Sequence, residues 1–556
     1  MKSLFEKKDI LSIHEEESDL SSLNKVLNVK DLTFFGIAAI IGAGIFSTIG
    51  RASYDGGPAV SLLFVFVSVA CVFTALCYAQ FASMIPISGS AYTYAYYSLG
   101  EVFAWVIGWA LILEYAVSNI VVAISWSEYF TSMLAGFGIH WADWLAIDYG
   151  SAHHALERMK EFTASGENVP EHFIKAAQTF QNAPELLGHK IIFDLPAGLV
   201  TIFITILAYI GIKESRNVSN ALVFLKLGII IFVIVAGAFF VKPENWSPFM
   251  PNGIGGVMSG VAAVFFAFIG FDSLSTMSEE TKNPQRDMPR AMIYCLVICT
   301  LLYVLISLVL TGMVNYKELR VDDPLAYVFD KVDMNFVAGI ISVSAVIAIT
   351  SALLIYQIGQ PRIWMTMSRD GLLGKRFSKI HPKFKTPSFS TLVTGGLVGL
   401  PAMFLDMQFV VDLTSVGTFF AFILVCAGTL FLDNKKLTAK AKFKIPYING
   451  QYIISPLLMV ALFLFFTKTD YVSVISEKPL IVCFWLVWSG LAISALKYKF
   501  SLIPVLGILF NLYLMTELGI SNWLMFIIWL ALGLVIYFCF GYRHSRLISN
   551  RKSDCS

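Results

Sequence analysis

Charged side chains are scarce in this sequence. Only 14% of the 556 residues are Asp, Glu, Lys or Arg, while 57% are hydrophobic; soluble proteins have about 25% charged residues. A soluble chain of this length would divide into several domains with charged surfaces, and this composition does not supply those surfaces. Neither sign of charge dominates, with 40 Lys and Arg against 38 Asp and Glu, which excludes a strongly basic nucleic-acid-binding protein.

The sequence also lacks the motifs of several other classes. It has no HExxH motif and no recognisable Ser/His/Asp set, so we expect neither an enzyme nor a cofactor. Its eight cysteines show no CxxC or Cys/His spacing typical of a metal site. No brief apolar core with a small-residue cleavage site precedes the first long apolar run, which begins near Leu32. We therefore expect the first span to be retained rather than cleaved as a signal peptide.

Long hydrophobic runs, by contrast, are abundant. Many reach about 17 to 25 residues, which is enough to cross a bilayer as a helix. The pattern predicts an all-α polytopic membrane protein with fourteen spans, or twelve spans and two re-entrant segments, because the eleventh and thirteenth runs are short. The predicted spans are 32–52, 59–84, 102–137, 191–212, 221–241, 257–277, 292–314, 336–367, 389–405, 409–432, 452–467, 480–496, 502–518 and 523–540.

Lys and Arg in short loops indicate the orientation, because basic loops stay in the cytoplasm. Basic residues concentrate in 362–385, in 435–444 and in 543–552, whereas the loop after the seventh span is acidic, with Glu318 and Asp323. All three basic segments lie on the cytoplasmic side if both termini are cytoplasmic. We therefore expect a multi-pass protein of the cell membrane with cytoplasmic tails 1–31 and 543–556. A long loop, 138–190, then lies outside. Its role and any accessory subunit cannot be read from the sequence.

Two of the predicted spans are interrupted by glycine at matching places. Many secondary transporters consist of inverted repeats whose first helices unwind near the middle of the membrane, where freed amides bind an anion and freed carbonyls bind a cation. The pattern predicts an amino acid site in which amides near Gly44 bind the carboxylate and carbonyls of Ile40, Phe266 and Ile269 bind the ammonium group. An alternative is close packing of helices through small residues. The candidate residues are Ile40, Ile41, Gly42, Ala43, Gly44, Phe266, Ile269 and Gly270.

Few charged residues fall inside the spans, and such residues are functional candidates by default. Glu114 lies in the third span and Lys226 in the fifth. Lys226 could snorkel to the membrane surface, and Glu114 could form a structural hydrogen bond between helices. Alternatively, the protonation of Lys226 changes with conformation, because burial and carbonyl acceptors act on it in opposite directions, and Glu114 is a second titrating group. Asp272, after the glycine of the sixth span, is interpreted mainly as a helix cap, with direct contact to the substrate as the alternative.

Several segments resemble the amino acid permeases of the APC superfamily, nearest to the cationic amino acid transporter family and its bacterial proton-coupled relatives. The resemblance covers about 32–545. It rests on IGAGIF at 41–46, LILEYAV at 111–117, GFD at 270–272, EETKNPQRDMPR at 279–290, PRIWMTMSRDGLL at 361–373 and the segment 503–544.

The resemblance implies a LeuT-type fold of five plus five helices in inverted repeats, 32–241 and 242–432, followed by additional helices in 433–542. Gly42, Ala43 and Gly44 match the break that holds the amino acid carboxylate. Lys226 matches a lysine that replaces the second sodium ion in sodium-independent relatives. Thr350 and Ser351 match the hydroxyl pair that lines this place.

These observations predict proton-coupled, sodium-independent import of amino acids by alternating access, with the amino acid, the proton and the lipid bilayer as partners. Three alternatives remain open: an exchanger, a potential-driven carrier of cationic amino acids, and a sensor that binds amino acids without transporting them. No acidic residue except Glu114 is a candidate to line the pocket, which favours a neutral substrate over Lys or Arg.

Overall fold

The computed structural model describes residues 7, 27–85, 90–165, 169, 171–211, 216–321, 323–430, 443–468 and 471–547. Most of the predicted tail 1–31, and parts of the basic segments 435–444 and 543–552, lie outside these residues. The first half of the chain contains the helical elements α2 (Val29–Ile40), η2 (Gly44–Thr48), α3 (Ile49–Gly56), η3 (Gly57–Ala59), α4 (Val60–Met84), α5 (Ser90–Ser98), α6 (Glu101–Gly136), η4 (Asp143–Leu145), α7 (Tyr149–Ser165), α8 (Glu171–Asn182), α9 (Leu195–Ile210), α10 (Arg216–Ala238), η5 (Pro243–Trp246), α11 (Gly253–Ser259), α12 (Val261–Phe266) and η6 (Phe271–Glu280).

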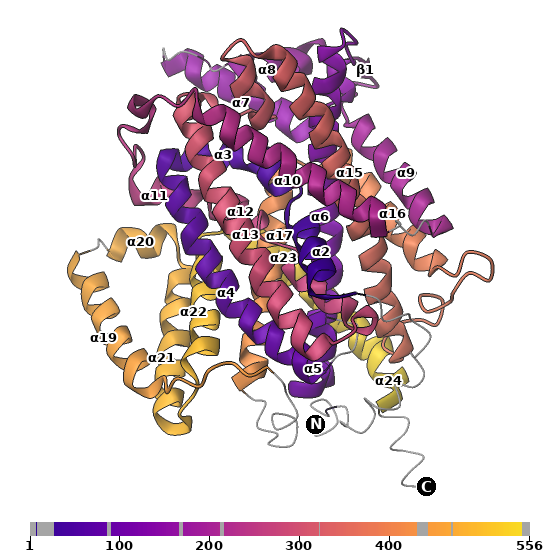
Figure 1. Ribbon diagram of the computed structural model, residues 1–556, viewed down its shortest axis with the longest axis vertical. Coiled ribbons are helices and arrows are strands. Elements are labelled where there is room, and N and C mark those ends of the chain that lie inside the picture. Colours follow the sequence, from indigo (N-terminus) through magenta and orange to yellow (C-terminus); the bar gives the residue numbers. More distant parts are fainter. Residues whose placement is uncertain are drawn as a thin grey trace.

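The second half continues the helical architecture (Figure 1). Its elements are α13 (Pro284–Met313), η7 (Tyr316–Glu318), α14 (Pro324–Asp330), α15 (Asn335–Arg369), α16 (Ser388–Ala402), α17 (Met407–Leu430), α19 (Gln451–Lys468), α20 (Tyr471–Glu477), α21 (Leu480–Tyr498), α22 (Leu502–Thr516), α23 (Ile520–Ile536), η8 (Tyr537–Gly541) and α24 (Tyr542–His544). The described strands, β1 (Glu185–Leu186) and β2 (His189–Lys190), form a short antiparallel hairpin.

The prediction of an all-α polytopic membrane protein is confirmed. Eight described helices are long and apolar enough to cross a membrane, and the bent pair Gly253–Ser259 and Val261–Ser275 makes a ninth. Four further apolar helices are shorter: Leu195–Ile210, Ser388–Ala402, Gln451–Thr467 and Leu502–Thr516. Because these helices are judged by length and composition alone, the count of fourteen spans and the division into two repeats stay predictions.

The first described helix, α2, begins at Val29, inside the predicted tail 1–31. The side chain of Asn28 accepts hydrogen bonds from the amides of Lys30 and Asp31, and the Asp31 carboxylate accepts one from the amide of Asn28. This reciprocal arrangement satisfies amide groups that have no partner within the helix. Hydropathy places the boundary later, because these capping residues are polar.

Helix α6 lies at the centre of the bundle, with 94% of its most apolar window buried. Its Trp109 indole donates to the Trp529 carbonyl of α23, at 2.8 Å, and the Trp529 indole donates to the Trp109 carbonyl, at 3.0 Å. Asn119 donates to Gln357 of α15, which in turn donates to Thr205 of α9. These polar bonds join α6 to α23 and α15, and α15 to α9.

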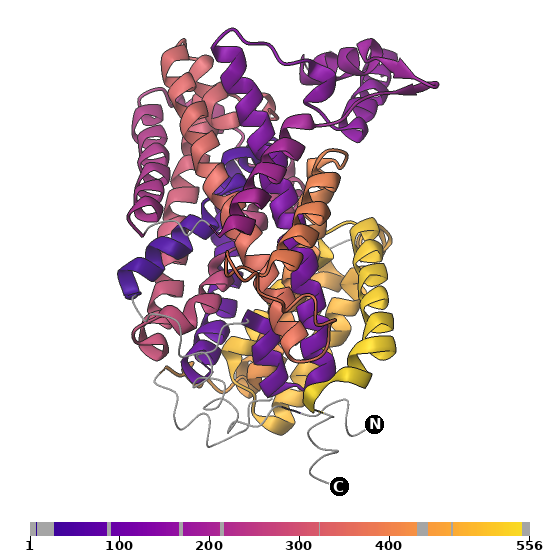
Figure 2. The same cartoon turned by 90° about the vertical axis from the view of Figure 1, so that its right-hand side faces the viewer.

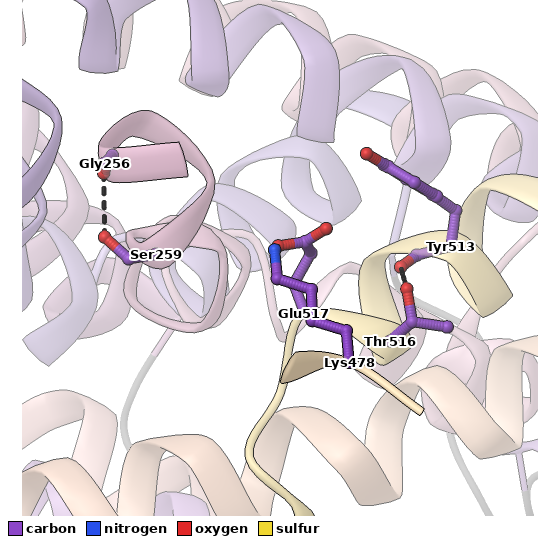
Figure 3. A network of polar contacts seen from close by, with 6 residues as sticks. All are labelled: Gly256, Ser259, Lys478, Tyr513, Thr516 and Glu517. Carbon is purple, nitrogen blue, oxygen red and sulfur yellow. Dashed lines mark hydrogen bonds and ion pairs between the residues drawn. The ribbon is translucent and has the colours of Figure 1, made fainter. Parts of the chain in front are cut away.

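Helices α19 to α22 form a group at the side of the bundle (Figure 1). They share a hydrophobic cluster of their own that includes Ile454, Phe484 and Trp488. Figure 3 shows one end of this group, where Lys478 forms an ion pair with Glu517 directly after α22. Three of the four predicted additional spans therefore pack together through an apolar interface, whereas the last one, in α23, packs against α6 and α17.

The described residues of the long loop 138–190 form an outer subdomain of α7, α8 and the β1–β2 hairpin, which projects beyond the bundle (Figure 2). Ser151 donates to the Asp406 carboxylate, at 2.8 Å, between α16 and α17. The Arg320 guanidinium lies over the rings of Tyr54 in α3 and Phe173 in α8, at 5.3 and 5.4 Å. The subdomain is thus tied to the bundle at two places.

Candidate substrate and coupling site

Two helices break where the sequence predicts. Helix α2 ends at Ile40, Ile41 is extended, and a turn of π-helix starts at Gly44. In the sixth predicted span, α12 ends at Phe266 and η6 follows Gly270, whose φ of 120° is open to glycine but strained for other residues. Both breaks free backbone groups inside the bundle, where such groups need a partner or a cavity.

The two breaks pack directly against each other. A Cβ added at Gly44 would lie 2.4 Å from the Cα of Ala267, and one added at Gly270 would lie 2.7 Å from the carbonyl oxygen of Ala39. The hydroxyl of Thr48 donates to the Ala263 carbonyl, at 3.1 Å. The glycines are therefore required by the approach of two backbones as well as by local conformation.

A small cavity lies between the breaks. With a volume of about 10 Å³, it has room for about one water molecule, so the surrounding side chains must separate to admit an amino acid. Of the predicted site residues, Ile40, Gly42, Ala43, Gly44, Phe266 and Ile269 line it, whereas Ile41 and Gly270 do not. The complete lining is Ala39, Ile40, Gly42, Ala43, Gly44, Val122, Phe266, Ile269 and Tyr356.

The freed backbone groups have the polarity that a zwitterion needs. Among the described residues, no backbone hydrogen bond outside the helices uses the amides of Gly42, Ala43 or Gly44. The Ile40 carbonyl accepts a hydrogen bond from the Tyr303 hydroxyl of α13, at 3.2 Å. Donors at the start of one half-helix and acceptors at the end of another can bind a carboxylate and an ammonium group.

Lys226 of α10 reaches the end of α2. It is fully buried, and its ammonium group donates to the carbonyls of Ala38 and Ile41, each at 3.0 Å. The side chain therefore points into the bundle rather than toward the membrane surface. It holds carbonyls that the break in α2 has released.

The hydroxyls of Thr350 and Ser351 lie on α15. Thr350 accepts a hydrogen bond from the Trp126 indole, at 2.8 Å, and donates to the Val346 carbonyl. Ser351 donates to the Ala348 carbonyl. Both hydroxyls thus donate to carbonyls of their own helix. That they lie beside the Lys226 ammonium group stays a prediction.

Two buried carboxyl groups, those of Glu114 and Asp272, lie beside the breaks. Glu114 of α6 is 2% exposed and interacts electrostatically with Asp272 of η6. The backbone at Gly270, Asp272 and Ser273 favours the charged form of the Asp272 carboxylate. Gly270, not Asp272, occupies the N-cap position of η6, so Asp272 acts within the first turn and the cap interpretation is corrected in this respect.

Residues 27–491 match the family model for amino acid permeases, and residues 501–545 match the model for the C-terminus of these permeases. The chain belongs to the amino acid permease family. The resemblance to permeases of the APC superfamily is therefore confirmed, and a transport protein rather than an enzyme is shown.

Three relatives show the range of the family around this permease. It is 37% identical over 546 residues to a branched-chain amino acid permease of Bacillus subtilis, covering 98% of this chain and 99% of the relative. It is equally identical over 548 residues to a methylthioribose transporter of the same bacterium, covering 98% of this chain and all of that one. A vacuolar cationic amino acid transporter of Arabidopsis thaliana is 30% identical over 621 residues, with 98% and 97% covered.

Sequence reasoning missed four residues of the candidate site: Ala39, Val122 and Tyr356, which line the cavity, and Tyr303, which bonds to Ile40. An apolar or aromatic residue in a long hydrophobic helix could equally face lipid, so composition alone does not select it. A signal existed for Val122, because it continues the stripe of Glu114 and Ser118 at four-residue spacing. No comparable signal marks Tyr303, whose partner is a backbone carbonyl.

Proposed function

We propose that this permease is a secondary active transporter that imports amino acids by alternating access, coupled to protons and independent of sodium. The hydrogen bonds from Lys226 to the carbonyls of Ala38 and Ile41 carry this proposal. In related folds, unwound carbonyls coordinate sodium. An ammonium group at such carbonyls supplies the positive charge without a metal ion.

Protonation of Lys226 can then control the end of α2. A charged ammonium group makes stronger hydrogen bonds than a neutral amine, each contributing about 1.5 to 3 kcal/mol. When the proton leaves, the bonds to the carbonyls of Ala38 and Ile41 weaken, and α2 is held less firmly to α10. Proton loading on one side of the membrane and loss on the other would thus drive the half-helix between two positions.

The energy of one proton suffices for useful accumulation. Moving one charge through 100 mV provides about 2.3 kcal/mol, which corresponds to roughly a fiftyfold concentration ratio. In this proposal the permease lies in the cell membrane with both termini in the cytoplasm, so the potential drives protons inward together with the substrate.

The substrate best supported by the cavity is a neutral amino acid with an apolar side chain. Backbone groups of the two breaks provide the polar contacts, and Val122, Phe266, Ile269 and Tyr356 provide the side-chain surface. None of the described residues that line the cavity is charged. The relatives do not decide the cargo, because those named for branched-chain amino acids and for methylthioribose are equally similar.

The test is uptake of radiolabelled leucine, lysine and methylthioribose into proteoliposomes. Leucine should accumulate when the outside is acidic, and replacing Na+ by choline should change nothing. Lys226→Met should abolish accumulation, whereas Lys331→Met, at the outer surface with a side chain 43% exposed, should behave like the wild type. Accumulation that requires sodium, or that survives in Lys226→Met, would contradict the coupling.

The same assay separates the alternatives. An exchanger would show counterflow of leucine without any response to the pH gradient. A potential-driven cationic carrier would prefer lysine and respond to voltage at equal pH. A sensor would bind substrate in a thermal-shift measurement but show no uptake.

A further inference from the structure

The outer subdomain, which projects beyond the bundle (Figure 2), contains a pocket of its own. This pocket lies between η4 and α8 and has a volume of about 150 Å³, against about 10 Å³ for the cavity between the breaks. It therefore admits a small molecule without any rearrangement of side chains. Its lining consists of Asp143, Trp144, Lys175, Gln178, Thr179 and Asn182.

One wall of the pocket is a polar face of α8. The four lining residues of this helix recur at three- and four-residue spacing, so they share one face. Phe180 of α8 and Trp144 of η4 both pack against the hydrophobic core of the subdomain, which is formed by Ala152, Ala183 and Ile192. This core holds the two walls of the pocket in place.

Most polar groups of the lining are available to a ligand. The side chains of Asp143, Lys175, Gln178 and Asn182 form no hydrogen bond or ion pair with the described residues, although ion pairs form elsewhere in the same subdomain. The Thr179 hydroxyl donates to the Lys175 carbonyl, at 3.0 Å, and can still accept. The pocket thus offers one anion, one cation and two carboxamide groups that both donate and accept.

A carboxylate and an ammonium group in one pocket match a small molecule that carries both charges. Asp143 can accept hydrogen bonds from an α-ammonium group, and Lys175 can donate to an α-carboxylate; hydrogen bonds between charged groups are the strong ones. The carboxamides of Gln178 and Asn182 suit a polar, neutral side chain, for which the Trp144 ring provides a flat surface. A neutral sugar would leave both charges unused.

We propose that the outer subdomain binds a free amino acid with a polar, neutral side chain, such as glutamine, in this pocket. The inference goes beyond the proposed transport function, because it adds a second amino acid site. The preference of this site differs from that of the cavity, whose side-chain surface is apolar and aromatic.

The pocket lies next to a contact between the outer subdomain and the first broken span. Phe173, two residues before Lys175 in α8, lies under the Arg320 guanidinium, which also covers the ring of Tyr54 in α3. Helix α3 continues the half-helix that begins at Gly44. An amino acid in the pocket therefore contacts the helix that is joined to α3 through Arg320.

The test is binding of radiolabelled glutamine to the full-length protein in lipid nanodiscs. Lys175→Met should weaken binding roughly 10- to 100-fold, as expected when a charged hydrogen-bond partner is removed. Lys160→Met, an exposed lysine of α7 outside the lining, is the matched control and should bind like the wild type. No saturable glutamine binding to the wild type, or equal binding by the two variants, would overturn the proposal.

Two further measurements test the other contacts. Asp143→Asn should weaken glutamine binding to a similar extent, because it removes the acceptor charge for the ammonium group. Glutamine amide, which lacks the carboxylate charge, should compete poorly with glutamine for the wild type. Full binding by Asp143→Asn, or competition by the amide as strong as that of glutamine itself, would contradict the assigned contacts.

The binding measurement does not depend on transport. In Gly44→Ala, which alters the cavity, glutamine binding should persist and should still be weakened by Lys175→Met; its loss in Gly44→Ala alone would place glutamine in the cavity and overturn the proposal. Failure of leucine uptake by the wild type, with glutamine binding intact, would contradict the proposed transport function and leave the outer site standing.

Discussion

The backbone of Gly44 lies against the backbone of Ala267, so close that a Cβ at Gly44 would come within 2.4 Å of the Ala267 Cα. The first broken helix cannot rotate or shift at this crossing without displacing the second. Because Gly270 makes a similar approach to Ala39, the contact is reciprocal. The two halves of the candidate substrate site therefore move as one body or separate completely.

Replacing Gly44 by alanine should impair transport severely. The added methyl group meets backbone atoms, which cannot rotate away, and overpacking of this kind typically costs about 1 to 3 kcal/mol. We expect a loss of roughly 10- to 100-fold in leucine uptake relative to the amount of folded protein in the membrane. Gly490→Ala is the control, because an added Cβ there meets nothing within 4 Å. Equal uptake by the two variants would remove Gly44 from the site.

Changing the size of Val122 should change which amino acids are transported. Val122→Ala widens the cavity wall and should favour phenylalanine over valine, whereas Val122→Phe should restrict transport to glycine and alanine. A difference of one methylene in a hydrophobic pocket alters selectivity by about 10- to 200-fold. Competition of each amino acid against radiolabelled leucine measures the change. Val117→Ala, on the same helix but outside the lining, should leave the ranking of substrates as it is.

The outer subdomain should become more stable as the pH falls. Burial raises the pKa of Asp148 above its ordinary value, although hydrogen bonds with Ser151 act in the opposite direction. The folded state then binds the proton more tightly than the unfolded state, so this group contributes stability at low pH that is lost as the pH rises through its folded pKa. Asp148→Asn should resist proteolysis in the loop better than the wild type at pH 8 and equally well at pH 4. Identical protection of both proteins at pH 8 would contradict this assignment.

Removing the Glu101 carboxylate should destabilise the end of the bundle where α6 begins. Glu101 is fully buried and accepts hydrogen bonds from Tyr96 and Tyr537, each at 2.8 Å, and from Ser545. Glu101→Ala leaves three hydroxyl donors without an acceptor, at a cost of about 1 to 3 kcal/mol each at most. A clear drop in the thermal unfolding temperature is expected. The exposed Glu157→Gln, in the outer subdomain, serves as the control, and a Glu101→Ala protein as stable as this control would contradict the role.

That the chain is a membrane protein was predictable, because this depends on its composition and on the length of its apolar runs. Low charge and long apolar runs give the helices without any knowledge of their neighbours. The breaks at Gly44 and Gly270 were predictable as well, since glycines interrupt two spans at matching places, although close helix packing was an alternative for the same glycines. Lys226 stood out for a similar reason, because a charge at that depth needs an acceptor.

What escaped prediction depends on neighbours that are distant in the sequence. Tyr303 is defined by a carbonyl 263 residues away, and nothing in its own segment points to that contact. Asp272 looked like a cap until Gly270 proved to hold that position. The docking of the outer subdomain could not be predicted for the same reason, because the hydrogen bond from Ser151 to Asp406 joins residues 255 positions apart.

The exchange of indole bonds between Trp109 and Trp529 joins residues 420 positions apart, which has a consequence for the biogenesis of the protein. The third span leaves the ribosome early, whereas α23 emerges almost last. These two bonds can therefore form only after α23 has been made, so the fastening of α6 to α23 is one of the last steps of assembly.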